Sequence, residues 1–303
     1  MTNDDAPQGA GRRDAVREKA QVVTARIRRR KIAKRATITI LIVAAVAAAA
    51  WAVWRTVQPE LEREVVVPEN VTGDGIDVRT ILAAGGEELP ETDAEQDPIR
   101  VEVYADYLDA DAGLFERENS EQLLSWVEEG AIDLAYHPLS LLSGQSNGTQ
   151  YSTRAAAAVV CAADYAPESF VAFNHAILDQ QPELESEGHT DEKIISIAKD
   201  ADVAQIDAVS DCIETREFAP WVADATDRAL EGSLPGTDGV AMTGSFLVLV
   251  NGVPYEGVPD DPAEFAQFVL TVSSEEYYST PTPEPSPEET AEPEQTDAPA
   301  DDE

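Results

Sequence analysis

The sequence contains few of the side chains that most often carry out chemistry in enzymes. Its 303 residues include two cysteines and three histidines. The histidines, His137, His175 and His189, are not at the spacings that typify metal ligands. The sequence also lacks a Gly-x-Ser-x-Gly elbow and a glycine-rich phosphate loop. These absences argue against a zinc enzyme, a serine hydrolase and a P-loop protein, and we expect no metal ion and no cofactor.

Basic residues are scarce beyond the first fifth of the chain. From Pro59 onward there are 55 acidic and nine basic residues, a net charge of −46. A surface with this charge repels nucleic acids and anionic lipids. We therefore expect neither of them to be a partner of this part of the chain, and solubility outside the cell is a sufficient explanation of its acidity.

One long apolar run interrupts this polar sequence. Residues 36–54 contain no charged side chain, and 11 basic residues precede them within residues 1–35. A helix of that length covers about 28 Å, close to the thickness of the hydrocarbon core of a bilayer. Trp51 and Trp54 end the run, where indole rings favour the membrane interface. The pattern predicts a single-pass plasma-membrane protein with a cytoplasmic N-terminus and an extracytoplasmic C-terminal part. The alternative is a signal peptide cleaved near Ala50.

The remaining sequence divides by composition. Residues 55–95 mix charges, glycine and short apolar runs, and are interpreted as an extracytoplasmic stalk with one strand near residues 75–79. Residues 96–273 have regular apolar periodicity, and are long enough to bury one sizeable core. Residues 274–303 are rich in Pro, Glu and Thr and contain no Leu, Ile, Val or Phe. That acidic tail is predicted to be disordered.

Within residues 96–273 the periodicity predicts both strands and helices. Strands are expected at residues 99–105, 132–137 and 246–250, and the Asn251-Gly252 pair predicts a hairpin into residues 254–257. The helices are predicted at residues 114–129, 151–165, 167–178, 190–200, 206–215, 219–230 and 261–271. This order indicates an α/β protein with a thioredoxin-like fold and an α-helical insertion, preceded by the transmembrane helix.

Several segments of this region resemble a known family. The runs VEVYADYLDADAGLFEREN (residues 101–119), DLAYHP (133–138), YSTRAAAAVVC (151–161) and LVNG (249–252) occur in the order and spacing of DsbA-like thiol–disulfide oxidoreductases. The resemblance is to their membrane-anchored actinobacterial type, and covers roughly residues 96–273. It implies a thioredoxin fold and an origin in protein disulfide exchange.

The motif that carries the activity of that family is missing. Its first helix opens with Cys-x-x-Cys, because a thiolate at a helix N-terminus has a lowered pKa. The aligned positions here are Asp109 and Ala112, so both sulfurs are absent. The family's cis-proline aligns with Phe246, and a cis bond before a non-proline residue costs about 3–4 kcal/mol, so we expect a trans peptide there. Asp109 is interpreted as a helix N-cap in a degenerate site.

Cys161 and Cys212 are the remaining cysteines. Each falls in a predicted helix of the insertion, and outside the cytoplasm one disulfide between them is expected. The resembled family often has a structural disulfide at these positions. The alternative is that this pair is itself redox-active, although the separation of 51 residues is unlike that of a Cys-x-x-Cys site.

These observations favour a non-catalytic thioredoxin-fold protein on the outer face of the membrane. It would bind a polypeptide or an envelope protein as a chaperone-like or scaffolding module. Two alternatives stay open. One is a thiol–disulfide oxidoreductase with residual activity through Cys161 and Cys212, and the other is an acidic spacer that holds a partner away from the membrane.

Overall fold

The computed structural model describes residues 45–49, 51, 65–86 and 98–279, with the backbone alone for residues 275–279. Residues 45–49 and 51 are helical. Among all the residues that the structure describes, no helix is long and apolar enough to cross a membrane. The predicted cytoplasmic segment, most of residues 36–54 and the end of the predicted tail lie outside the described residues, so the anchor stays a prediction. By their internal contacts, residues 1–64 and 65–303 form two units.

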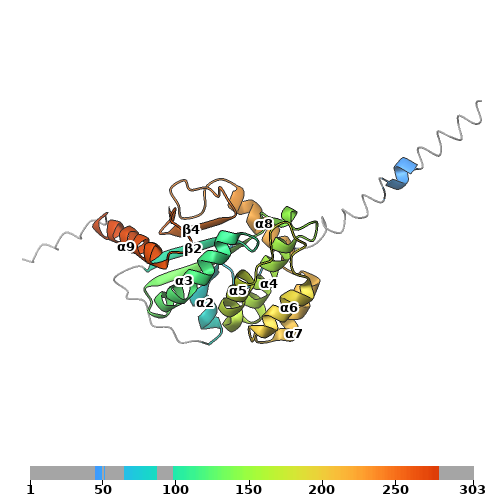
Figure 1. The fold of residues 1–303 in the computed structure, drawn as a ribbon, viewed down its shortest axis with the longest axis horizontal. Coiled ribbons are helices and arrows are strands. Elements are labelled where there is room, and N and C mark those ends of the chain that lie inside the picture. Colours follow the sequence, from blue (N-terminus) through green and yellow to red (C-terminus); the bar gives the residue numbers. More distant parts are fainter. Residues whose placement is uncertain (1–44, 50, 52–64, 87–97, 280–303) are drawn as a thin grey trace, which may run out of the picture. The chain divides into compact units, whose positions relative to one another are not determined.

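The second unit is built on one mixed sheet (Figure 1). β2 and β3 are parallel, and the other neighbouring strands are antiparallel. The strand order is β1 (Ile76–Asp77), β3 (Ile132–Leu139), β2 (Ile99–Asp106), β4 (Phe246–Val250) and β5 (Val253–Pro254).

The central strand β2 is buried from Val101 to Asp106 because both of its faces are covered. Val101 and Val103 belong to the main hydrophobic core, whereas Tyr104 belongs to a second cluster with Leu249 on the opposite face. Successive side chains of a strand point to opposite faces, so one strand serves both clusters. The helix α3 (Ala110–Glu128) connects β2 to β3 in a crossover, as a parallel pair requires.

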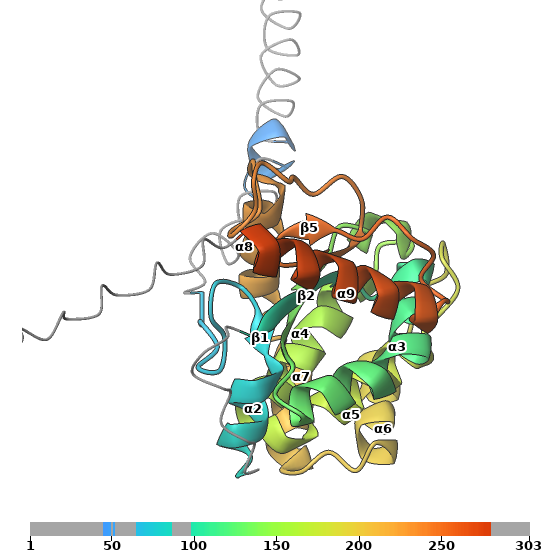
Figure 2. The same cartoon turned by 90° about the vertical axis from the view of Figure 1, so that its left-hand side faces the viewer.

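A group of helices is inserted between β3 and β4. In Figure 1 these helices lie toward the right of the domain, and α9 (Pro262–Ser279) lies at its left end; Figure 2 looks onto α9 with most of the inserted helices behind it. Residues 155–163 of α4 are buried on all sides, which is why this run of alanine, valine and cysteine is apolar throughout. The inserted helices are α4 (Tyr151–Tyr165), α5 (Phe170–Asp179), α6 (Asp191–Asp200), α7 (Ile206–Thr215) and α8 (Ala219–Leu230), with short 3-10 turns at Ser143–Gln145 and Pro167–Ser169.

The predicted fold class, α/β and thioredoxin-like with a helical insertion, is confirmed for the described part of the chain. Several bounds differ. α3 begins four residues earlier than predicted because Asp109 caps it, and α9 continues to Ser279, into the predicted tail. Residues 65–86, within the predicted stalk, add β1 and α2 (Val78–Ala84) to the domain. The side chains of Ile76, Val78 and Ile81 are fully buried, so this segment contributes to the core.

Candidate functional site

The N-terminus of α3 lies at the end of β2, where the sequence comparison placed the lost cysteine motif. Asp109 is the N-cap, and one of its carboxylate oxygens accepts a hydrogen bond from the backbone N–H of Asp111 at 2.9 Å. Its own N–H donates to the carbonyl of Asp106 at 3.0 Å. A carboxylate at this point satisfies one of the free N–H groups that begin every helix, and suits the positive end of its dipole.

The loop before β4 is fastened to this helix end. The Ser245 hydroxyl donates to the second carboxylate oxygen of Asp109. The Ser245 carbonyl accepts from the backbone N–H of Asp106 at 2.9 Å. Asp109 therefore joins the loop to α3 through a side chain, at the position from which a catalytic thiolate would react.

Phe246 follows in the position aligned with the family's cis-proline. No cis peptide bond occurs in the described part of the chain, so the bond before Phe246 is trans. The Phe246 ring lies 5.6 Å from the Phe115 ring of α3, and its backbone pairs with Ala105 of β2. An aromatic contact thus takes a place that a proline would leave open.

Ala112, at the second aligned cysteine position, is 2 % exposed and belongs to the core. The next residue, Gly113, touches the segment that follows α5: a Cβ atom there would lie 2.2 Å from Oε1 of Gln181. The side-chain amide of Gln181 in turn donates to the Asp109 carbonyl at 2.9 Å. The first turn of α3 is therefore held from two sides, by Ser245 and by Gln181.

Asp106 is a buried carboxylate that the sequence reasoning missed. It is fully buried and accepts three hydrogen bonds, from the N–H of Leu108 and of Leu142, both at 2.8 Å, and from the Ser152 hydroxyl at 2.6 Å. Burial raises the pKa of Asp106, and these hydrogen bonds oppose the shift. Because its acceptor sites are occupied, Asp106 anchors the connection from β3 to α4. The sequence signal that could have revealed it is the aspartate at the end of the predicted strand at residues 99–105.

The two cysteines form a disulfide, with a Cα–Cα distance of 5.9 Å. It joins α4 to α7, and the two residues are 0 % and 2 % exposed. Cys161 is nine residues beyond Ser152 on α4, roughly 14 Å along the helix axis. The sulfurs are thus buried among the inserted helices and apart from the N-terminus of α3.

His175 has a serine and a glutamate as neighbours but does not form a catalytic triad. Its Nδ1 atom lies 3.2 Å from the Ser120 hydroxyl and 3.5 Å from the carboxylate of Glu116. A triad needs the serine at one ring nitrogen and the acid at the other. Here both face the same nitrogen, so the imidazole cannot pass a proton from one to the other. The hydrogen bond to Glu116 raises the pKa of His175.

His137 lies on the opposite face of the sheet. Its ring stacks on Tyr104 with centroids 4.1 Å apart, and its Nε2 atom is 3.5 Å from Glu102. Within the described ranges, no three His, Cys, Asp or Glu side chains converge so that they could hold a metal ion.

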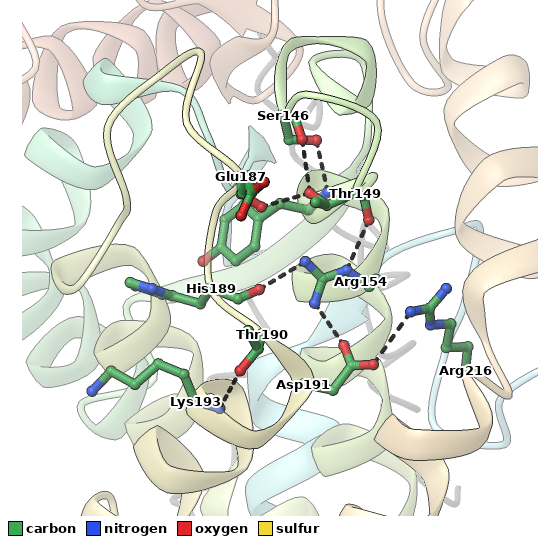
Figure 3. A network of polar contacts seen from close by, with 10 residues as sticks. Ser146, Thr149, Arg154, Glu187, His189, Thr190, Asp191, Lys193 and Arg216 are labelled. Carbon is green, nitrogen blue, oxygen red and sulfur yellow. Dashed lines mark hydrogen bonds and ion pairs between the residues drawn. The ribbon is translucent and has the colours of Figure 1, made fainter.

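A buried arginine organises the loop between α5 and α6 (Figure 3). The Arg154 guanidinium, on α4, donates to the carbonyls of Thr149 and His189 at 3.0 and 2.7 Å, and to the Asp191 carboxylate at 2.6 Å. Arg216, which follows α7 as its C-cap, reaches the second oxygen of Asp191 at 3.3 Å. Because this loop carries Gln181, the network also supports the segment that contacts α3.

The comparisons with known proteins agree with this architecture. The family model described as thioredoxin matches residues 103–257. The reduced form of the disulfide bond oxidoreductase DsbG from Mycobacterium tuberculosis is similar, with 26% identity and a TM-score of 0.52, over 67% of this chain and 89% of that chain. Reduced DsbA from the same organism has 26% identity and a TM-score of 0.51, over 66% and 93%.

A third similar structure is MdbA, a thiol-disulfide oxidoreductase from Actinomyces oris. It has 17% identity and a TM-score of 0.51, over 69% of this chain and 93% of that chain, a likeness that concerns the fold. Among proteins with curated descriptions, none is significantly similar in sequence.

Proposed function

Because the chain belongs to the thioredoxin family and has the fold of DsbA-type oxidoreductases, we propose that it has exchanged disulfide chemistry for binding. In this proposal it is a redox-inactive, chaperone-like or scaffolding module that holds a polypeptide or an envelope protein. The anchor at residues 36–54 would place it on the outer face of the plasma membrane.

One observation carries the proposal: the N-terminus of α3 presents a carboxylate where disulfide exchange needs a thiolate. Exchange proceeds by attack of a thiolate on a disulfide sulfur through a mixed disulfide. The Asp109 carboxylate cannot form that bond, and its two oxygens already accept hydrogen bonds from Asp111 and Ser245. Ala112 offers a buried methyl group in the second position.

The remaining sulfurs support the same proposal. Reactive cysteines lie in exposed, electropositive surroundings, whereas buried cysteines are inert. Cys161 and Cys212 are paired with each other inside the insertion. The alternative, residual exchange through this pair, requires α4 and α7 to separate before a substrate thiol can reach either sulfur.

The surface beside the site suits a basic partner. Ala110, Asp111 and Gly244 are exposed around the half-buried Asp109. A lysine or arginine of a bound polypeptide could pair with Asp111, whose carboxylate is solvent-exposed. The strong acidity of the outer part would also speed the approach of such a partner at low salt.

Turnover of disulfide substrates tests the loss of chemistry. The purified protein is expected to leave insulin disulfides and scrambled ribonuclease unchanged. A variant combining Asp109→Cys with Ala112→Cys is the matched control, because it restores two thiols on the same helix. Turnover by the unaltered protein that disappears in Cys161→Ser would overturn the proposal in favour of the oxidoreductase.

Binding is tested by a photocrosslinking side chain at Ala110, with Glu214 on α7 as the control position, since both are exposed. We expect one discrete protein adduct from position 110 in intact cells, weakened by Asp111→Lys. Adducts of equal yield from both positions would contradict binding at the N-terminus of α3 and would favour a spacer.

A further inference from the structure

The residue that follows the C-cap of α5 reaches across to the first turn of α3. The side-chain amide of Gln181 donates to the Asp109 carbonyl at 2.9 Å, and the same carbonyl accepts a bond from the backbone N–H of Gly113 at 3.3 Å. A carbonyl oxygen has two lone pairs and can accept both bonds. Because the bond from Gln181 is the shorter of the two, this side chain helps to set the direction in which α3 begins.

Gly113 makes this contact possible because it has no side chain. A Cβ atom at position 113 would lie 2.8 Å from Cδ of Gln181 and 2.8 Å from the carbonyl oxygen of Leu178, and closer still to Oε1 of Gln181. Either the glutamine or the end of α5 would have to move. Glycine is less favourable than alanine inside a helix, but here it permits the close approach of Gln181.

The loop that carries Gln181 is closed at its two ends. The Nε2 atom of His189 lies 2.6 Å from the carbonyl oxygen of Gln180. A carbonyl can only accept, so Nε2 carries a proton and donates it. The backbone at His189 is in turn held by Arg154, which is 7 % exposed and donates to the His189 carbonyl at 2.7 Å (Figure 3). Arg154 therefore fixes the loop from which Gln181 extends.

We infer that Gln181 is a positioning residue for the binding of a polypeptide at the N-terminus of α3, a role that rests on the function proposed above. Asp109 is hydrogen-bonded to Ser245 through its side chain and to Gln181 through its carbonyl. Ala110 and Asp111 stay exposed between these two contacts. Gln181 thus directs a bound segment across Ala110 and Asp111 by fixing the helix turn that presents them.

Hydrogen exchange of the full-length protein tests the positioning in the absence of a partner. Gln181→Glu keeps the size of the side chain but replaces its donor by an acceptor, which faces the Asp109 carbonyl. Because one hydrogen bond is lost, the amide of Gly113 is expected to exchange about fivefold faster. Asn147→Ala is the matched control, since Asn147 donates to the Glu185 carbonyl at 2.6 Å in the same loop. Exchange at Gly113 that is unchanged in Gln181→Glu, or raised equally in the control, overturns the inference.

Photocrosslinking from position 110 in intact cells gives the functional readout. Gln181→Glu and Gly113→Ala disturb the same contact from opposite sides, so each is expected to reduce the adduct about fivefold, and the double variant no further. Gln181 is half-buried, so Gln181→Glu decides the matter even if Gly113→Ala fails to fold.

The two possible failures of this experiment differ. No adduct from the unaltered protein would overturn the proposed function, and the positioning role with it. A clear adduct from the unaltered protein that is undiminished in folded Gln181→Glu would refute the positioning role alone. A purely structural role of Gln181 would change the urea concentration of unfolding and leave the adduct as it was.

Discussion

The hydroxyl of Ser245 donates a hydrogen bond to the Asp109 carboxylate, so residues 136 positions apart connect the loop before β4 to the first turn of α3. In an oxidoreductase of this fold the helix end must stay open to a substrate disulfide. Here the cap of the same helix end is hydrogen-bonded to a loop of the protein itself.

Asp109→Ala is expected to lower the free energy of unfolding by about 1–2 kcal/mol, because it removes the N-cap and the Ser245 bond together. Ser245→Ala should cost about 1 kcal/mol, and the double variant less than the sum, since both single changes break the same bond. Urea unfolding of the three variants measures this. Strictly additive costs would mean that the bond contributes nothing.

The Glu116–His175 pair makes part of the stability depend on pH. The hydrogen bond to Glu116 raises the pKa of His175 in the folded protein. A raised histidine pKa stabilises the fold fully below the unfolded value, about 6.5, and this contribution disappears as pH rises through the folded value. The effect is modest because the side chain is 42% exposed.

Unfolding measured between about pH 5.5 and 8.5 should show the difference between the protein and His175→Gln shrinking as pH rises above 6.5. His189→Gln serves as the control, since this residue has no carboxylate as an ion-pair partner among the described contacts. A difference that grows with pH, or an equal profile in both variants, contradicts the assignment.

Breaking the disulfide should destabilise the domain without creating or abolishing any activity. The bridge closes a loop of 51 residues, worth about 4 kcal/mol in the chain-entropy model. Cys161→Ser with Cys212→Ser should therefore unfold at markedly lower urea concentration. Partner crosslinking at position 110, measured below that concentration, should persist. Loss of crosslinking from a still folded variant would instead link the bridge to binding.

Arg154 and Arg228 provide a matched comparison of a buried and an exposed arginine. Arg154→Ala removes the donor to two carbonyls and to one oxygen of Asp191, which then keeps only Arg216, and should cost about 2–4 kcal/mol, since removal of one partner of a buried pair is strongly destabilising. Arg228 pairs with Asp74 at 2.8 Å, but its side chain is 47% exposed. Arg228→Ala should cost less than about 1 kcal/mol. Thermal unfolding of both variants checks the order, and equal shifts would contradict it.

Local patterns were enough to predict the main strands and helices. The alternation in residues 99–105 and the spacing in residues 114–129 follow directly from which side chains face the core. The positions of Asp109, Ala112 and Phe246 were also identified, because they lie within a recognisable succession of segments. The disulfide between Cys161 and Cys212 could be predicted from the expected extracytoplasmic location and from the two helices that carry these residues.

Contacts between distant short segments could not be predicted in this way. The bond between Ser245 and Asp109 depends on the register of β2 against β4, and no periodicity reports it. The role of Asp106 was missed because an aspartate at a strand end is usually solvated, whereas here Leu142 and Ser152 surround it. Residues 65–86 were assigned to the stalk, with one strand near residues 75–79, because a strand of two residues and a helix of seven are too short to show that the segment packs into the core.

The sheet order also governs how the chain reaches its folded state. β2 must pair with β4, and 141 positions separate Ala105 from its partner Phe246. At the usual speed of synthesis, about 5–20 residues per second, the edge of β2 waits roughly 7–28 s before that partner emerges. During this interval the unpaired edge of β2 is a template for wrong pairing, so the long separation of these two strands exposes the chain to misfolding during its synthesis.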